Sequence, residues 1–178
     1  MRKFWPSISA LVLLVVGFAA VPVNLCAQGA FAIETGKAFD SALPKDFYLE
    51  GNAIPTQKRN AALVKTPAGA RALFALIDTT GYSSQIQQKY AGMLITEGSL
   101  SVGGHKLGVG SYGFGYTKPA ATSSEDARFF VYNQAGEKVS ECAAKKDTEL
   151  AKPKPLQVVT AMGPTARLYF GRYWVELK

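Results

Sequence analysis

The sequence predicts an all-β protein: an antiparallel β-sandwich of about eight to ten short strands that follows an N-terminal signal helix. From Phe47 onward, short runs of β-branched and aromatic residues are interrupted by turn residues about every eight to twelve positions. No long stretch among these runs repeats apolar residues at the helical period. Short, uneven strands suit two packed sheets better than one regular closed barrel, so the sandwich is the preferred architecture.

The first 27 residues have the layout of a cleaved secretory signal peptide. Arg2 and Lys3 form a positive n-region, and the apolar run Ile8–Val21 follows it. This run is shorter than the roughly 20 apolar residues that a transmembrane helix needs, so no stable membrane span is expected after cleavage. Cleavage is predicted after Ala27, and the small residue Ala32 marks the alternative cleavage site.

Cys26 offers a second processing route, because bacterial lipoproteins are cleaved just before a cysteine that receives lipid. The residue before that cysteine is normally Gly, Ala or Ser, whereas this chain has Leu25. Lipid anchoring at Cys26 is therefore disfavoured. The sequence predicts export from a bacterial cell, either to the periplasm or to the outside.

Cleavage leaves a chain of the size of one domain. Residues 28–45 are small and mixed, with Gly36 and Pro44 among them, and predict a flexible lead-in. Residues 46–178 predict a single β domain. Cys142 is then the only cysteine, so no intramolecular disulfide can form, and its position on a strand predicts a buried, unreactive thiol.

The basic charge of the chain does not indicate a nucleic-acid partner. Removing Arg2 and Lys3 with the signal lowers the formal charge from +7 to +5. The remaining basic residues are scattered, whereas nucleic-acid binding favours a basic stripe with interleaved aromatics. The partner expected instead is an unidentified envelope or extracellular molecule, and the sequence does not predict the oligomeric state.

Strands are predicted wherever such an apolar run lies between turn residues. Two hairpins are indicated, one turning at Gly103-Gly104 and one at Ala135-Gly136. The polar stretch Ser83–Lys89 is the one segment that could form a helical turn or two. The predicted strands are Asp46–Glu50, Ala61–Lys65, Arg71–Ile77, Tyr90–Glu97, Leu100–Val102, His105–Leu107, Ser111–Thr117, Arg128–Asn133, Lys138–Cys142, Leu156–Ala161, Ala166–Phe170 and Tyr173–Leu177.

The sequence indicates no catalytic, cofactor-binding or metal-binding residues. A zinc site needs three or four ligands, and the mature chain has one histidine, His105, and one cysteine on different predicted hairpins. A nucleophile pair of Cys142 and His105 is a remote alternative. Ser83 and Ser84 lack the second glycine of a nucleophile elbow.

One candidate ligand site is an aromatic shelf. In the stretch 111–116, strand alternation puts three aromatic residues on one face and Gly113 and Gly115 on the other. Glycine in a strand often marks the close approach of a ligand or another side chain. Tyr169 and Trp174, near the C-terminus, are the candidate rings to lie over these glycines. The plain interpretation is core packing, and the sharper one is a shelf on which a sugar stacks.

The segment Gly103–Phe114 follows the pattern G-G-x-x-L-x-x-G-x-Y-x-F. It resembles a hairpin of exported bacterial β-domain proteins of unknown function and similar size. Asp78–Tyr90, Pro155–Val158 and Arg167–Arg172 also resemble one such group from soil bacteria, so the resemblance covers about residues 47–178. It implies export and β architecture, and it supplies no catalytic residue. Val109 stands where those proteins often carry a proline.

The function expected from these observations is non-enzymatic. The mature chain is interpreted as an envelope or secreted β domain that binds a partner or a small ligand, without a cofactor. Two alternatives remain open: a calycin-like barrel that carries an apolar ligand, and a hydrolase with an unrecognised site. A filled core favours the first interpretation, a central cavity the calycin-like barrel, and convergent polar groups in a cleft the hydrolase.

Overall fold

The structure is a computed structural model that describes residues 29–119, 127–161 and 163–178. The predicted signal peptide (1–27), Cys26 and the cleavage site after Ala27 therefore lie outside the described residues. Two short helices, α1 (Lys37–Ala42) and α2 (Ser84–Lys89), accompany thirteen strands in the described ranges. The strands are β1 (Ala32–Glu34), β2 (Asp46–Leu49), β3 (Asn52–Lys65), β4 (Arg71–Ile77), β5 (Gly92–Thr96), β6 (Leu100–Val102), β7 (His105–Leu107), β8 (Gly110–Thr117), β9 (Ala127–Tyr132), β10 (Lys138–Lys146), β11 (Gln157–Thr160), β12 (Ala166–Phe170) and β13 (Tyr173–Leu177).

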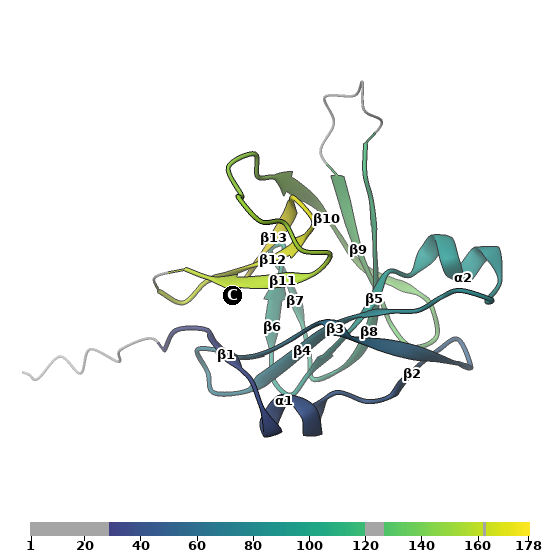
Figure 1. Cartoon of the computed structure of the whole chain (residues 1–178), viewed down its shortest axis with the longest axis horizontal. Helices are drawn as coiled ribbons and strands as arrows, with labels where there is room; N and C mark the ends of the chain where they lie inside the picture. Colours follow the sequence, from purple (N-terminus) through teal and green to yellow (C-terminus); the bar gives the residue numbers. More distant parts are fainter. Residues whose placement is uncertain (1–28, 120–126, 162) are drawn as a thin grey trace, which may run out of the picture.

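The strands form one antiparallel sheet that is nearly closed on itself (Figure 1). Its hydrogen-bonded order is β1-β3-β4-β5-β8-β9-β10-β13-β12-β11, with β2 paired to β3 and the β6–β7 hairpin paired to β13. At the end of this path, β11 returns to within contact distance of β1 and β3 without a ladder of hydrogen bonds to them. The predicted all-β antiparallel class is confirmed.

The sheet is buried on both faces along β4. Phe74 and Ala72 point to the interior cluster, whereas Leu73 and Ala75 point to an outer cluster. The outer cluster includes residues of β2, α1 and α2, and in Figure 1 β2 and α1 lie on the side of β3 and β4 away from β11–β13. This double burial explains why β4 has a continuous apolar sequence in place of an alternating one.

Aromatic rings fill the interior of the nearly closed sheet. The centroids of Phe114 and Phe129 each lie 5.1 Å from that of Phe170, and all three side chains are almost completely buried. Phe74 is fully buried in the same cluster. Tilted and offset ring pairs at such distances are favourable packing arrangements.

The structure differs from the flexible lead-in predicted for residues 28–45. From residue 29 on, this segment contributes β1 and α1 to the fold, and Phe31 is only 4% exposed. β1 pairs with the end of β3, with Ile33 opposite Val64. Its local sequence gives little indication of a strand, because the partner that stabilises it lies thirty residues further along the chain.

The predicted turns are present. Gly103 and Gly104 have φ of 58° and 88° and connect β6 to β7, a backbone that favours glycine at both positions. Gly136 has φ of 88° in the turn between β9 and β10. The ambiguous stretch Ser83–Lys89 forms α2, where the Ser83 hydroxyl accepts a hydrogen bond from the backbone N–H of Ile86.

Candidate functional site

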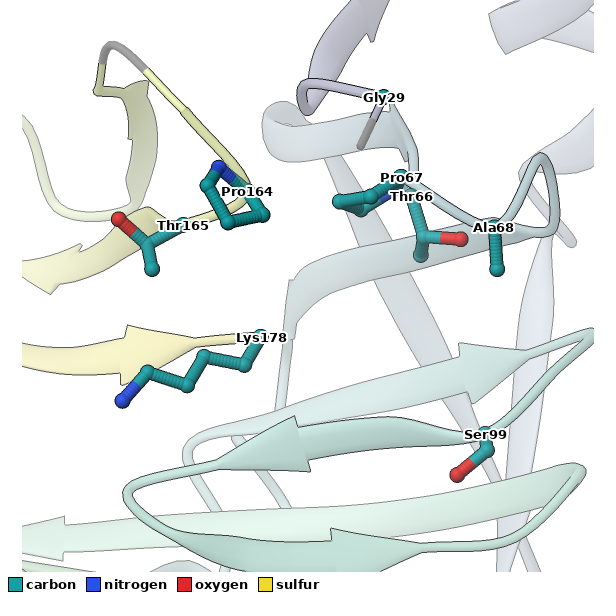
Figure 2. A pocket seen from close by; sticks show the side chains of 8 residues that line it. All are labelled: Gly29, Thr66, Pro67, Ala68, Ser99, Pro164, Thr165 and Lys178. Atoms are coloured by element: carbon teal, nitrogen blue, oxygen red, sulfur yellow. The ribbon is translucent and has the colours of Figure 1, made fainter. Parts of the chain in front are cut away.

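The main candidate site is a hollow of about 420 Å³ at one end of the sheet (Figure 2). It is built by connecting segments, as binding sites on rigid scaffolds commonly are. Pro67 from the turn between β3 and β4 faces Pro164 from the loop before β12, and Ser99 and Lys178 lie below them in Figure 2. The remaining lining residues are Gly29, Thr66, Ala68 and Thr165.

Thr66 is the one buried polar residue of this lining, at 5% exposure. Its backbone N–H donates to the carbonyl oxygen of Ala70 at 2.7 Å, and its own carbonyl accepts from Gly69 N–H at 2.8 Å. These bonds fix the turn between β3 and β4. The Thr66 Oγ1 atom is buried and has no hydrogen-bond partner among the described residues. A buried hydroxyl without a partner is unfavourable and is a group that a ligand can satisfy.

The lining is chemically simple. Half of the lining residues are proline, alanine or glycine, and three others, Thr66, Ser99 and Thr165, carry hydroxyl groups. The Nζ atom of Lys178 forms an ion pair with Glu176 Oε2 at 2.7 Å. The hollow is therefore suited to an apolar body that carries a hydrogen-bonding group.

The predicted shelf is not assembled as the sequence suggested, because Gly113 and Gly115 do not face Tyr169 or Trp174. A side-chain carbon at Gly113 would lie 2.6 Å from the Tyr90 ring, and one at Gly115 would collide with the carbonyl oxygen of Lys89. The aromatic residues of β8 do belong to the interior cluster, as the alternation predicted. Because Gly113 and Gly115 lack side chains, the end of α2 and the following Tyr90 pack closely against the outer face of β8.

Tyr169 and Trp174 are neighbours across β12 and β13, with ring centroids 6.4 Å apart. Tyr169 is only 2% exposed, and its hydroxyl donates to Asp147 Oδ2 at 2.8 Å. Burial raises the pKa of Tyr169, and the hydrogen bond from Tyr169 lowers the pKa of Asp147. Tyr169 is therefore a packed structural residue and not an open stacking surface.

The ring of Trp174 is partly exposed and is covered by cations. The guanidinium of Arg167 on β12 lies 4.2 Å from its centroid, and the Nζ of Lys145 on β10 lies 5.5 Å away. These two strands flank β13 on opposite sides. Cation–π contacts thus occupy the positions where a sugar would stack.

A second polar cluster, which the sequence analysis missed, joins three turns. Glu50 forms an ion pair with Lys89, and its Oε1 accepts from the hydroxyl of Tyr90 at 2.6 Å. Lys89 Nζ also donates to the carbonyl oxygen of Gly136 at 2.6 Å and lies 5.0 Å from the ring centroid of Tyr132. Nothing in the local sequence could reveal the cluster, because its members come from positions 50, 89–90 and 132–136.

The environment of this cluster shifts two pKa values in opposite directions. Hydrogen bonds from Lys89 and Tyr90 lower the pKa of Glu50, while burial and the neighbouring Glu50 carboxylate raise the pKa of Tyr90. Glu50 also has a φ of 49°, which is uncommon for a residue with a side chain. Because Glu50 binds both Lys89 and the Tyr90 hydroxyl, and Lys89 also binds the Gly136 carbonyl, the cluster is a clamp that holds α2 to the turn between β9 and β10.

Cys142 and His105 do not form a catalytic pair in the described part of the chain, where no hydrogen bond joins them. Cys142 is partly buried against the interior cluster, and burial raises the pKa of its thiol. Its sulfur packs against Gly103, where a side-chain carbon would collide with it. His105 is exposed on β7.

Comparisons with known proteins give no relative of this chain: no family model, no curated protein and no solved structure matches it. Within residues 29–119, 127–161 and 163–178, His, Cys, Asp and Glu side chains form no group of three that could hold a metal ion. In the same ranges, no helix is both long and apolar enough to cross a membrane. The site is therefore interpreted from its own geometry.

Proposed function

We propose that this protein is a non-enzymatic, exported β domain of the bacterial envelope that binds a small, largely apolar ligand in the hollow at the end of its sheet. The observation that carries the proposal is a hollow of about 420 Å³ whose lining residue Thr66 has a buried hydroxyl without a partner among the described residues. Small-molecule sites commonly occupy roughly 300–1,000 Å³ and combine apolar walls with a few polar groups.

Binding is favoured over catalysis by the groups that line the hollow. They are hydroxyl groups and aliphatic carbon, together with a lysine already paired to Glu176. A ligand with an apolar body and one hydroxyl, carbonyl or amide group would match them. The filled interior favours this end site over the central cavity of a calycin-like carrier. Export is proposed from the signal pattern of residues 1–27.

The first test fills the hollow with a side chain from an exposed turn. Ala68→Trp should abolish binding, and the matched control Ala135→Trp changes another exposed turn outside the lining. The parent protein, isolated from a bacterial envelope extract, should carry a bound small molecule in native mass spectrometry. Ala135→Trp should retain that adduct and Ala68→Trp should lose it. A parent that carries no adduct, or an adduct unchanged in Ala68→Trp, would contradict the proposal.

The second test separates binding from stability. Thr66→Val removes the unpartnered hydroxyl with little change of shape, so the empty protein should become more stable by about 1 kcal/mol. The same change should weaken ligand retention, because the ligand loses its hydrogen bond. A variant that is less stable than the parent would mean that Thr66 serves the fold and not a ligand.

A further inference from the structure

A second hollow, of about 280 Å³, lies where β11 returns to β1 and β3 (Figure 1). Its lining comes from β1, α1, the middle of β3 and the segment that leads into β11. It shares no lining residue with the hollow around Thr66. Small-molecule sites commonly occupy roughly 300–1,000 Å³, so this hollow suits a ligand at the small end of that range.

Apolar side chains line this hollow from both of the clusters that the sheet separates. Phe39 of α1 packs on the outer cluster and is only partly buried, whereas Leu156, just before β11, belongs to the interior cluster. Ile33 on β1 also lines the hollow and is 51% exposed. Covering such an exposed side chain with an apolar ligand is favourable, because apolar surface is removed from water.

The charged groups of the lining favour an anion. Arg59 and Lys154 are exposed, and neither forms an ion pair with a carboxylate within the described ranges. Lys58, the third cation of the lining, is paired with Asp40 at 2.8 Å. Glu34 is the one carboxylate of the lining. Arg59 and Lys154 together outweigh it, so the hollow is electropositive and attracts anions.

The backbones that carry these two cations are held in place. The carbonyl oxygen of Lys154 accepts a hydrogen bond from Gly171 N–H at 3.0 Å, and Pro153 and Pro155 restrict the chain on either side. Arg59 lies in the extended middle of β3. Only the ends of the two side chains therefore have to be ordered by an anion, which lowers the entropic cost of binding.

We infer that this second hollow binds a short apolar carboxylate, such as the anion of a medium-chain fatty acid. The hydrocarbon chain packs against Ile33, Phe39 and Leu156. The carboxylate pairs with the guanidinium of Arg59, whose planar group can bind both of its oxygens, and with the ammonium of Lys154. This site does not depend on the function proposed for the hollow around Thr66.

The test compares three probes that separate the contribution of the hydrocarbon chain from that of the charge. Octanoate should bind saturably and shift the amide NMR signals of residues 33–35 and 156–158. Butanoate should bind more weakly, by about fourfold for each buried methylene group that it lacks. Octyltrimethylammonium has the same chain with the opposite charge, and it should leave these signals unchanged.

Two variants test the anion contacts. Arg59→Gln and Lys154→Gln should each weaken octanoate binding about tenfold or more, as expected when a hydrogen bond to a charged group is lost. Lys106→Gln is the matched control, since Lys106 is an exposed cation on β7 outside the lining, and it should bind octanoate as the parent does.

Three results would overturn the inference. The first is the absence of saturable octanoate binding, or equal binding of octyltrimethylammonium. The second is an unchanged octanoate affinity in Arg59→Gln and Lys154→Gln. The third is octanoate binding that Ala68→Trp abolishes, because octanoate would then occupy the hollow around Thr66.

Discussion

Gly113 offers the sharpest test of how the outer face of β8 is packed. A side-chain carbon at this position would lie 2.6 Å and 2.8 Å from two ring carbons of Tyr90 and 2.9 Å from a methyl carbon of Leu49. Tyr90 has little room to withdraw, because it is 2% exposed, its hydroxyl is bonded to Glu50, and its ring packs edge-on against Tyr132 at 5.4 Å. Leu49 is fully buried.

Gly113→Ala should therefore destabilise the protein. Overpacking of this kind costs about 1–3 kcal/mol, and the replacement of a strand glycine by alanine returns about 0.5–1 kcal/mol. The net loss of up to about 2.5 kcal/mol corresponds to a fall in Tm of up to about 10 °C for a domain of this size. Gly108→Ala is the matched control, since a side-chain carbon there meets no atom within 4 Å and the backbone is not left-handed.

Thermal unfolding monitored by circular dichroism gives the Tm of both variants. If Gly113→Ala melted at or above the temperature of Gly108→Ala, the packing of Tyr90 against β8 would be wrong. A double variant identifies the contact directly. When Gly113→Ala is combined with Tyr90→Leu, the two losses should be less than additive, because the smaller side chain removes the collision.

Three further predictions concern the clamp, the thiol and the N-terminus. The pKa of Glu50 is lowered in the folded state, so the ionised carboxylate stabilises the fold at neutral pH and this stabilisation is lost as the pH falls. Glu50→Gln should therefore be less stable than the parent by about 1–2 kcal/mol at pH 7. This difference, measured by urea unfolding, should shrink below about pH 4. Cys142 should react slowly with a bulky maleimide in the folded protein and rapidly in urea, because it is partly buried with a raised pKa; equal rates would contradict this. The mature protein should begin at residue 28, because cleavage after Ala32 would remove the buried Phe31, and intact-mass measurement can verify this. Phe31→Ala should lower the free energy of unfolding by about 3–5 kcal/mol. A much smaller loss would mean that Phe31 does not decide between the two cleavage sites.

Most of the strands could be predicted from local sequence. The predicted bounds of β4, β6, β12 and β13 agree with the structure. These strands are rich in apolar residues, and turn residues such as Gly103 and Gly171, both with positive φ, stop them sharply. Where the local pattern and the tertiary packing require the same backbone, the sequence is sufficient.

The first half of β3 could not be predicted in the same way. Pro55 and the polar run from Thr56 to Asn60 do not have the composition of a strand. This stretch becomes extended because β2 pairs with Asn52–Pro55, and the register against β4 shifts between Thr56 and Ala61. Pairing with distant segments therefore overrides local propensity here, as it does for β1.

The candidate site was predicted least well, for a related reason. Sequence alternation correctly separated the glycines of β8 from its aromatic residues, but it could not show what approaches the glycines. Tyr90 and Lys89 reach them only because the α2 segment folds back over β8. Likewise, an unpartnered hydroxyl at Thr66 has no sequence signature, since it depends on which turns meet at the end of the sheet.

The packed interior explains why the proposed ligand site lies at the margin of the sheet. Phe114, Phe129 and Phe170 occupy the centre, so a ligand could enter there only by displacing rings that stabilise the fold. The turn at Thr66 carries an unsatisfied polar atom instead, and this atom reduces stability until a ligand pairs with it. A change there should therefore alter binding and stability in opposite directions: Thr66→Val should raise the Tm of the unliganded protein while weakening the binding of its ligand. If this variant lowered both quantities together, the hydroxyl would be part of the fold and the site would have to be withdrawn.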